Sequence, residues 1–222
     1  VFGFAVTTPG VTPSAVPASE VYSCAELIGR EQVGSGADWA LIRLDRKVNG
    51  HEPLKYDAAT PVKNGDELVV IGHPAGLPTK VAGGSTVRDA SPNGYFVANL
   101  DTYGGNSGSA VFNAKTGVIV GILVRGENDY VHKDGCSVSN VCPSTGCRGE
   151  DVTNISVLSA SIPRLPAEKA TLANRADVFR SDRTDATVAQ LVDVVDVAAR
   201  YPELAGLDTL AQDVIDCLPQ AH

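Results

Sequence analysis

Short apolar stretches recur along the first two thirds of the chain, and glycine- and proline-rich turns separate them. The pattern predicts strands over residues 1–7, 20–28, 38–44, 67–72, 79–89, 94–100 and 118–124. Residues 8–19 hold three prolines and a glycine, so we expect a loop there. Many short strands joined by such turns are typical of an antiparallel β-barrel or sandwich.

The pattern changes after residue 162, and glycine nearly vanishes from residue 167 onward. Apolar residues at helical spacing predict one helix that begins near Asp185 and ends before Pro202, and a second over about 207–218. We therefore expect two domains, a β domain over 1–162 and an α-helical appendage over 163–222. Packing of the appendage on the barrel is one interpretation; a pro-segment or a partner-binding module is the other.

Composition narrows the function classes. No apolar run approaches eighteen residues, so we expect no membrane span. The net charge of -8 argues against nucleic acid as a partner, because phosphate binding needs basic side chains. No cofactor is predicted. The sequence has no methionine, so we expect residues upstream of Val1 in the translated protein.

Five cysteines bear on the cellular compartment. Cys136, Cys142 and Cys147 lie in a short polar stretch, which in a non-cytosolic protein indicates disulfide-closed loops. A secreted or periplasmic location is therefore expected. The alternative is a zinc site formed by these three residues with His132, although the stretch lacks the usual Cys-x2-Cys pair. Our prediction is that no metal is bound.

One glycine-flanked serine carries candidate chemistry. It is Ser107, in the stretch Gly104–Phe112. Glycine permits backbone angles suited to a tight turn, and the N–H groups of such a turn can hold an oxyanion beside a serine Oγ. An ordinary hairpin loop would have the same composition.

Two further motifs accompany this turn. Asp38 opens the apolar run Asp-Trp-Ala-Leu, and a Gly-His-Pro-Ala-Gly turn spans residues 72–76. Together with Gly-Gly-Asn-Ser-Gly-Ser at 104–109, they resemble the chymotrypsin-fold serine peptidases, in their bacterial trypsin-like and glutamyl endopeptidase branch. The resemblance covers residues 1–162. It implies a mostly β fold of two antiparallel barrels, the first incomplete at its N-terminus.

The resemblance also implies roles. Ser107 resembles the nucleophile, Asp38 the acid that orients a catalytic histidine, and the N–H groups of Gly105 and Ser107 the oxyanion hole. The implied function is hydrolysis of protein or peptide substrates through an acyl-enzyme.

The specificity pocket follows from the same resemblance. Asp101 corresponds to its floor, with Thr102 beside it, and the strand from Leu123 to Gly126 to its wall. An acidic floor favours Arg or Lys substrates. Arg125 leaves two alternatives open, since it could pair with Asp101 or meet an acidic substrate.

The catalytic histidine is missing from its expected place. The family order is His, Asp, Ser, yet no histidine precedes Asp38. The four histidines are His51, His73, His132 and His222. We expect the base on a segment upstream of Val1, and the chain alone to be nearly inert. Use of His73 in a permuted order is one alternative; a pseudo-peptidase or secreted binding module of the same fold is another.

Overall fold

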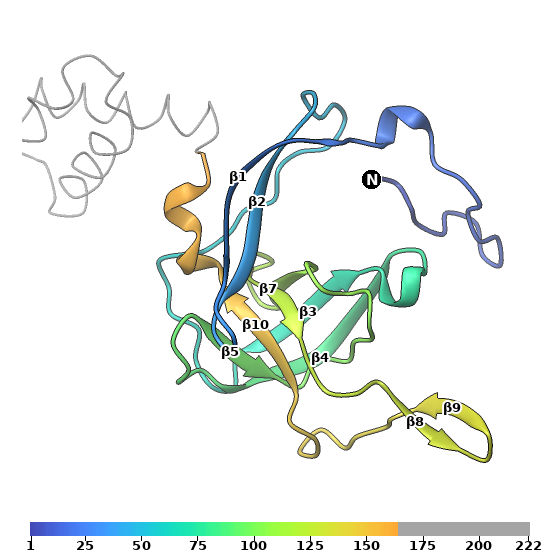
Figure 1. The fold of residues 1–222 in the computed structure, drawn as a ribbon, viewed down its shortest axis with the longest axis vertical. Helices are drawn as coiled ribbons and strands as arrows, with labels where there is room; N and C mark the ends of the chain where they lie inside the picture. Colours follow the sequence, from blue (N-terminus) through green and yellow to red (C-terminus); the bar gives the residue numbers. More distant parts are fainter. Residues whose placement is uncertain (164–222) are drawn as a thin grey trace, which may run out of the picture. The chain divides into compact units, whose positions relative to one another are not determined.

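The computed structural model describes residues 1–163, which form a mostly β structure (Figure 1). Chain contacts divide the protein into two units, Val1–Ile162 and Pro163–His222. The helices predicted after residue 162 lie outside the described residues. Short 3₁₀ turns are the only helical segments in the described part: η1 (Ala18–Glu20), η2 (Pro74–Gly76), η3 (Ile155–Val157) and η4 (Ser159–Ser161). No helix among these residues is long and apolar enough to cross a membrane.

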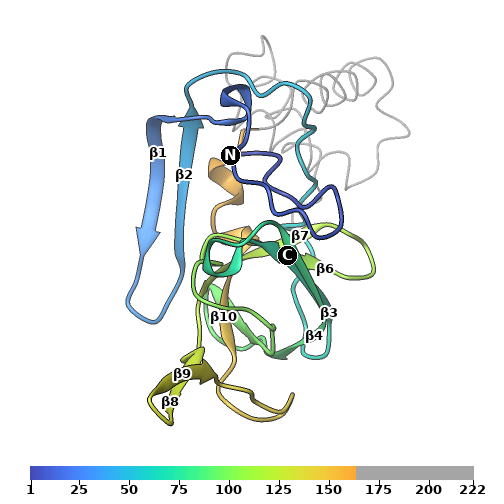
Figure 2. The ribbon, with the colours of Figure 1, turned by 90° about the vertical axis from the view of Figure 1, so that its right-hand side faces the viewer.

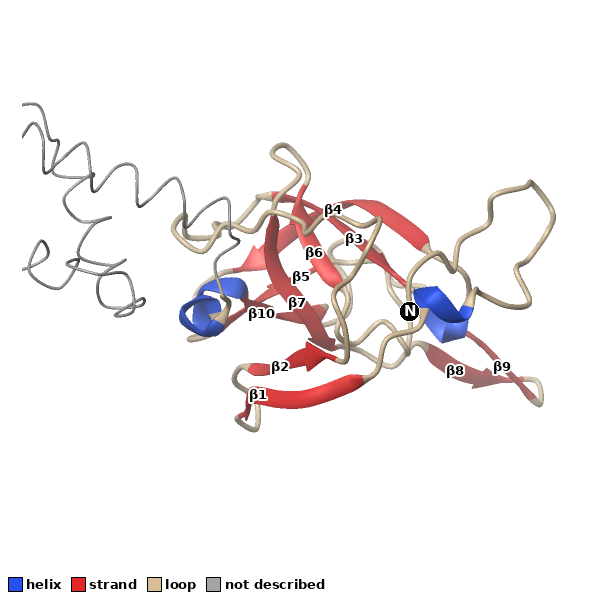
Figure 3. Ribbon diagram, turned by 90° about the horizontal axis from the view of Figure 1, so that it is seen from above, coloured by secondary structure: helices blue, strands red, loops and turns tan. Residues whose placement is uncertain are grey.

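Six antiparallel strands close into one barrel, in the order β10-β5-β4-β3-β6-β7 (Figure 3). The barrel strands are β3 (Glu67–Gly72), β4 (Lys80–Asp89), β5 (Tyr95–Ala98), β6 (Ala110–Asn113), β7 (Ile119–Arg125) and β10 (Glu150–Asn154). Closure leaves these strands without a free edge.

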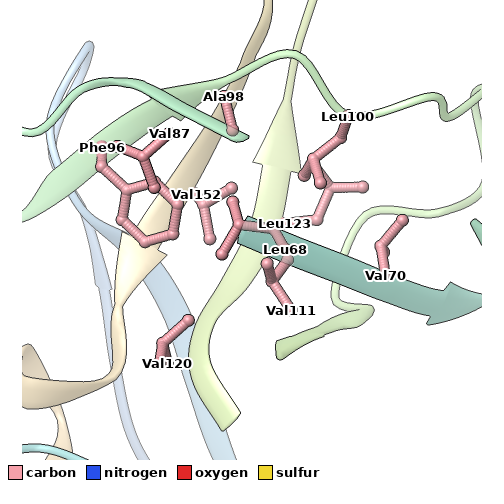
Figure 4. Close-up of a cluster of buried hydrophobic side chains, with 10 residues drawn as sticks. All are labelled: Leu68, Val70, Val87, Phe96, Ala98, Leu100, Val111, Val120, Leu123 and Val152. Carbon is pink, nitrogen blue, oxygen red and sulfur yellow. The ribbon is translucent and has the colours of Figure 1, made fainter. Parts of the chain in front are cut away.

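Alternating side chains from the strands fill the barrel (Figure 4). In β3, for example, Leu68 and Val70 are buried while Glu67 and Ile71 are exposed. The core consists of Leu68, Val70, Val87, Phe96, Ala98, Leu100, Val111, Val120, Leu123 and Val152. Burial of apolar side chains of this size stabilises a fold by roughly 1.5–3 kcal/mol each, so this cluster holds the barrel.

The N-terminal part contributes one two-stranded sheet, not a second barrel. Its strands are β1 (Cys24–Gln32) and β2 (Asp38–Leu44), which pair antiparallel. Figures 1 and 2 show them as a long hairpin outside the barrel wall. Within residues 1–163, the double barrel implied by the resemblance is thus represented by one closed barrel and this hairpin.

Residues 1–7 do not form the predicted strand. The segment has no strand partner among residues 1–163. Its backbone hydrogen bonds run from Phe2 N to Glu20 O, from Ala5 N to Gly3 O and from Thr79 N to Phe4 O, each at 2.9 Å. Three isolated bonds do not make a ladder, so apolar alternation alone was misleading here.

A second hairpin projects from the barrel between β7 and β10 (Figure 2). It comprises β8 (Tyr130–Lys133) and β9 (Cys136–Ser139). Asp134 and Gly135 join them, both with positive φ, as a tight two-residue hairpin turn requires. All eight strand residues are exposed, so this hairpin adds nothing to the core.

Candidate active site

Ser107 lies in the turn between β5 and β6 and is exposed. Its Oγ donates a hydrogen bond to the carbonyl of Val124 (3.1 Å). The next residue, Gly108, donates its N–H to Leu123 O (2.7 Å) and has φ +90°, a conformation that favours glycine. The serine turn is thereby fixed along β7.

Some backbone N–H groups of the serine turn donate hydrogen bonds within the described part of the chain, and others do not. Asn106 N donates to Tyr103 O (3.1 Å), and Ser109 N donates to Asn106 O (2.9 Å). By contrast, the N–H groups of Gly105 and Ser107 have no acceptor in the described part of the chain. Unpaired N–H donors beside a serine hydroxyl are what stabilisation of an oxyanion requires.

The turn rests on β3 and on the 3₁₀ turn η2. Asn106 is buried, and its Oδ1 accepts a hydrogen bond from Ser109 Oγ (3.5 Å). A Cβ at Gly72 would lie 2.1 Å from Ser109 Oγ and 2.5 Å from Asn106 Oδ1. Ala75 N also donates to Gly104 O (2.7 Å). The Gly-His-Pro-Ala-Gly turn recognised in the sequence therefore packs directly against the serine turn.

Asp38, the first residue of β2, is held by β10. The hydroxyl of buried Thr153 accepts a hydrogen bond from Asp38 N and donates one to Asp38 O, both at 2.9 Å. The Asp38 carboxylate is half-buried and accepts a long hydrogen bond from Gln32 Nε2 (3.4 Å). Asp38 is thus held mainly through its backbone N–H and carbonyl, which Thr153 binds.

Arg125 connects the two candidate catalytic residues. It lines a small pocket beside Ser107, and its guanidinium donates to the carbonyl of Gly36, two residues before Asp38. The same guanidinium pairs with buried Asp151 (2.8 Å). Among residues 1–163, Arg125 makes no ion pair with Asp101. Its positive charge is balanced by Asp151 instead.

The histidines of the described part have other partners. The Nδ1 atom of His73 lies 3.0 Å from Leu77 O, and its ring stacks on Phe4. His73 is thus bonded to the backbone of its own turn. His51 contacts Glu20 (2.7 Å) and stacks on Phe2. His132 is exposed in β8, and His222 lies outside the described residues.

A pocket of about 60 Å³ opens beside Ser107, and we call it the serine pocket. Four other predicted site residues line it: Thr102, Leu123, Arg125 and Gly126. Asp101 does not. It lines an adjoining cavity of about 480 Å³, and the two spaces share Thr102, Tyr103, Glu127, Asp129 and Glu150.

The three acids among these shared residues were not singled out from the sequence. Glu127 and Asp129 follow the wall strand, and Glu150 begins β10. Only the pairing of β7 with β10 brings Glu150 to the wall. The sequence does show acidic residues on either side of the cysteine-rich stretch. That pattern alone does not indicate that these acids lie beside Ser107.

A disulfide closes part of the adjoining cavity. Cys142 and Cys147 are bonded, and both line that cavity. The Arg88 guanidinium donates to the carbonyls of Cys147 (3.0 Å) and Ser144. The predicted disulfide-closed loop is thus confirmed, and two of the four candidate zinc ligands are oxidised. Cys24 and Cys136 are exposed and form no disulfide within residues 1–163, and Cys217 lies outside these residues.

A family comparison agrees with this geometry. The model of the trypsin-like peptidase domain matches residues 6–122, more than half of the chain. The chain belongs to the trypsin-like peptidase family. The matched part of this peptidase domain contains Asp38 and Ser107 and ends within β7, before Glu150.

Solved structures similar to this peptidase domain include those of the Rv3671c protease from M. tuberculosis. Its active form is 17% identical with a TM-score of 0.40, covering 55% of this chain and 51% of that chain. Its inactive form is 15% identical with a TM-score of 0.40, covering 59% and 63%. The chain thus spans about half to two thirds of these proteins. No curated protein matches it.

Proposed function

We propose that the protein is a serine endopeptidase in which Ser107 is the nucleophile. The observation that carries this proposal is the exposed Ser107 hydroxyl beside the unpaired N–H groups of Gly105 and Ser107. Membership of the trypsin-like peptidase family supports it and implies a protein substrate.

The proposed reaction has two steps. Ser107 Oγ attacks the scissile carbonyl and gives its proton to a base, and the N–H groups of Gly105 and Ser107 stabilise the resulting oxyanion. The protonated base then transfers that proton to the departing amine, which leaves an acyl-enzyme. Water, deprotonated by the same base, attacks the ester and releases the acid and Ser107.

We further propose that the base is a histidine outside the 222 residues, oriented by Asp38. No histidine precedes Asp38, and His51 and His73 contact Glu20 and Leu77 instead. A serine hydroxyl without an adjacent base is a poor nucleophile. The histidine would lie on a preceding segment of the protein or on an associated polypeptide. The disulfide supports our proposal of a secreted or periplasmic location.

The test compares the 222-residue chain with a form that carries the histidine-bearing segment. Only the extended form is expected to hydrolyse peptides and to react with a fluorophosphonate at Ser107. A Ser107→Ala variant of that form should do neither. Full-rate hydrolysis by the 222 residues alone would refute the assignment of the base. Failure of the extended form to react would favour the second candidate, a non-catalytic binding module of the same fold.

A further inference from the structure

Glu150 stands between the serine pocket and the adjoining cavity, since it lines both. Its carboxyl group lies against the wall strand. A Cβ added to Gly126 would be 1.5 Å from Glu150 Oε2 and 2.3 Å from Oε1. The carboxyl therefore occupies the place that a side chain at position 126 would fill. A substrate side chain that enters beside Ser107 would meet it first.

The other acids of the serine pocket are already hydrogen-bonded. Asp129 accepts from Gly104 N (2.6 Å), and Glu127 accepts from Arg148 N (2.7 Å). In residues 1–163, no ion pair engages the carboxyl of Glu150, and its hydrogen-bond donor is the backbone N–H of Glu127. All three carboxylates thus accept a backbone N–H, and Glu150 differs from the other two in lying against Gly126 of the wall.

We propose that Glu150 is the specificity-determining residue of the serine pocket, and that it receives the ammonium of lysine or the guanidinium of arginine. This proposal rests on the proposed function, because it places the substrate residue beside Ser107. It differs from the expectation from sequence, in which Asp101 has this role. Asp101 lines the adjoining cavity and a separate pocket shared with Gly72 and Asn106, but not the serine pocket.

The charges around Glu150 favour a cation. Three cations are close, and all have partners: Arg125 and Arg148 pair with the two oxygens of buried Asp151, and Arg88 donates to the carbonyls of Cys147 and Ser144. Glu127 and Asp129 add two further negative charges at the pocket. With all of these groups and Asp101 of the adjoining cavity ionised, five negative charges face three positive ones. A bound ammonium or guanidinium would offset part of this excess.

Burial raises the pKa of Glu150 from 4.5 to about 6, and repulsion from Asp129, Asp151 and Glu127 adds to the effect. The backbone N–H of Glu127 acts in the opposite direction. Glu150 is therefore largely ionised at pH 7.5 and largely neutral at pH 5. Binding of a cation should weaken over this interval, because the neutral carboxyl no longer attracts it.

The test measures binding of benzamidine, an aryl amidinium, to the 222-residue chain by calorimetry or NMR. Benzamidine should bind the wild type, and about tenfold more weakly at pH 5 than at pH 7.5. Glu150→Gln should weaken binding at pH 7.5 by about tenfold or more and abolish that pH dependence. The matched variant Asp101→Asn should change affinity by less than about threefold. Neutral benzamide should bind wild type and Glu150→Gln equally.

Two results would overturn the proposal. One is loss of benzamidine binding in Asp101→Asn with binding retained in Glu150→Gln. The other is a wild type that does not distinguish benzamidine from benzamide. Gly126→Ala provides a second variant, since its Cβ must displace the carboxyl of Glu150; it too should lose affinity.

This measurement is independent of the chemistry of Ser107. Benzamidine should still bind Ser107→Ala. If the extended protein fails to react with a fluorophosphonate while benzamidine binds through Glu150, the proposed function fails and the pocket assignment stands. If Ser107 reacts and benzamidine does not bind, the pocket assignment fails alone.

Discussion

Gly72 determines how closely β3 approaches the serine turn. A Cβ at this position would lie 2.1 Å from Ser109 Oγ, a distance that no relaxed structure permits. Gly72→Ala should therefore destabilise the protein by about 2 kcal/mol or more and displace Ser107. Urea denaturation measures the first effect and fluorophosphonate labelling of the extended protein the second.

Gly83→Ala is the matched control, because a Cβ there meets only Val69 Cγ2, at an ordinary 3.6 Å. It should change the free energy of unfolding by less than about 0.5 kcal/mol. Equal effects of the two substitutions would show that contact with the serine turn is not what requires glycine at position 72.

Glu150 should lower stability at neutral pH. Its pKa is raised from 4.5 to about 6 in the folded state, so the folded protein binds more protons than the unfolded chain between these values. Stability from this group therefore falls as pH rises through that window. Glu150→Gln should be more stable than wild type at pH 7.5, by up to about 1 kcal/mol after allowance for solvent screening.

This difference should disappear below about pH 4.5, where Glu150 is protonated in both states. Thermal unfolding from pH 4 to pH 8 measures it. Glu52→Gln, at an exposed loop position, is the control and should not show the same trend. A Gln variant that is less stable at pH 7.5 would contradict the assigned burial of the carboxyl.

At the scale of elements, β10 links the barrel to the hairpin that carries Asp38. Thr153→Val keeps the shape of the side chain but leaves Asp38 N and O without their partner. We expect a loss of about 1–3 kcal/mol in the free energy of unfolding and a lower kcat in the extended protein. Thr153→Ser retains the hydroxyl and should retain most of the activity. Loss in Thr153→Ser without loss in Thr153→Val would point to the methyl group instead.

The sequence predicted β1 to β5 and β7 as apolar runs, but it did not predict β6, which follows the serine turn. The bounds of β2 and β3 match the predicted runs, because an acid opens each run and apolar residues fill it. The strands β8 and β9 were missed because their side chains are exposed and carry no pattern. The strand β10 was missed for another reason: its burial comes from Asp151 and Thr153, whose polar groups are bonded, and Val152 is its only apolar residue.

Some residues of the candidate site could be predicted from the sequence, and others could not. Ser107 and Asp38 stand in local motifs that resemble those of the chymotrypsin-fold peptidases, so the sequence was enough to single them out. Glu150 and Thr153 have their roles only because β10 pairs with β7 and contacts β2. Contacts between residues so far apart in the sequence leave no trace in local composition.

At the scale of the whole molecule, one disulfide constrains a surface loop and not the barrel. Cys142 and Cys147 are five residues apart, so loop closure predicts a contribution of about 2 kcal/mol. The double variant Cys142→Ser, Cys147→Ser should lose about this amount of stability but bind benzamidine as wild type does, because neither cysteine lines the serine pocket. Denaturation with and without a reductant measures the loss.

Cys24→Ser is the control for that variant, since Cys24 is exposed and has no disulfide partner among residues 1–163. It should leave both stability and its response to reductant unchanged. A reductant effect that persists in the double variant would show that another pair of cysteines is bonded.

The segment 127–149 begins and ends at adjacent points of the barrel. Arg125 and Asp151 are register partners in β7 and β10, and their side chains form an ion pair at the base of the segment. The exposed hairpin and the disulfide loop both lie between them. A segment inserted between two paired residues can be replaced without changing how the two strands pair. Relatives could acquire a different loop here, and with it a different cavity wall, while the barrel register and the serine turn are inherited unchanged.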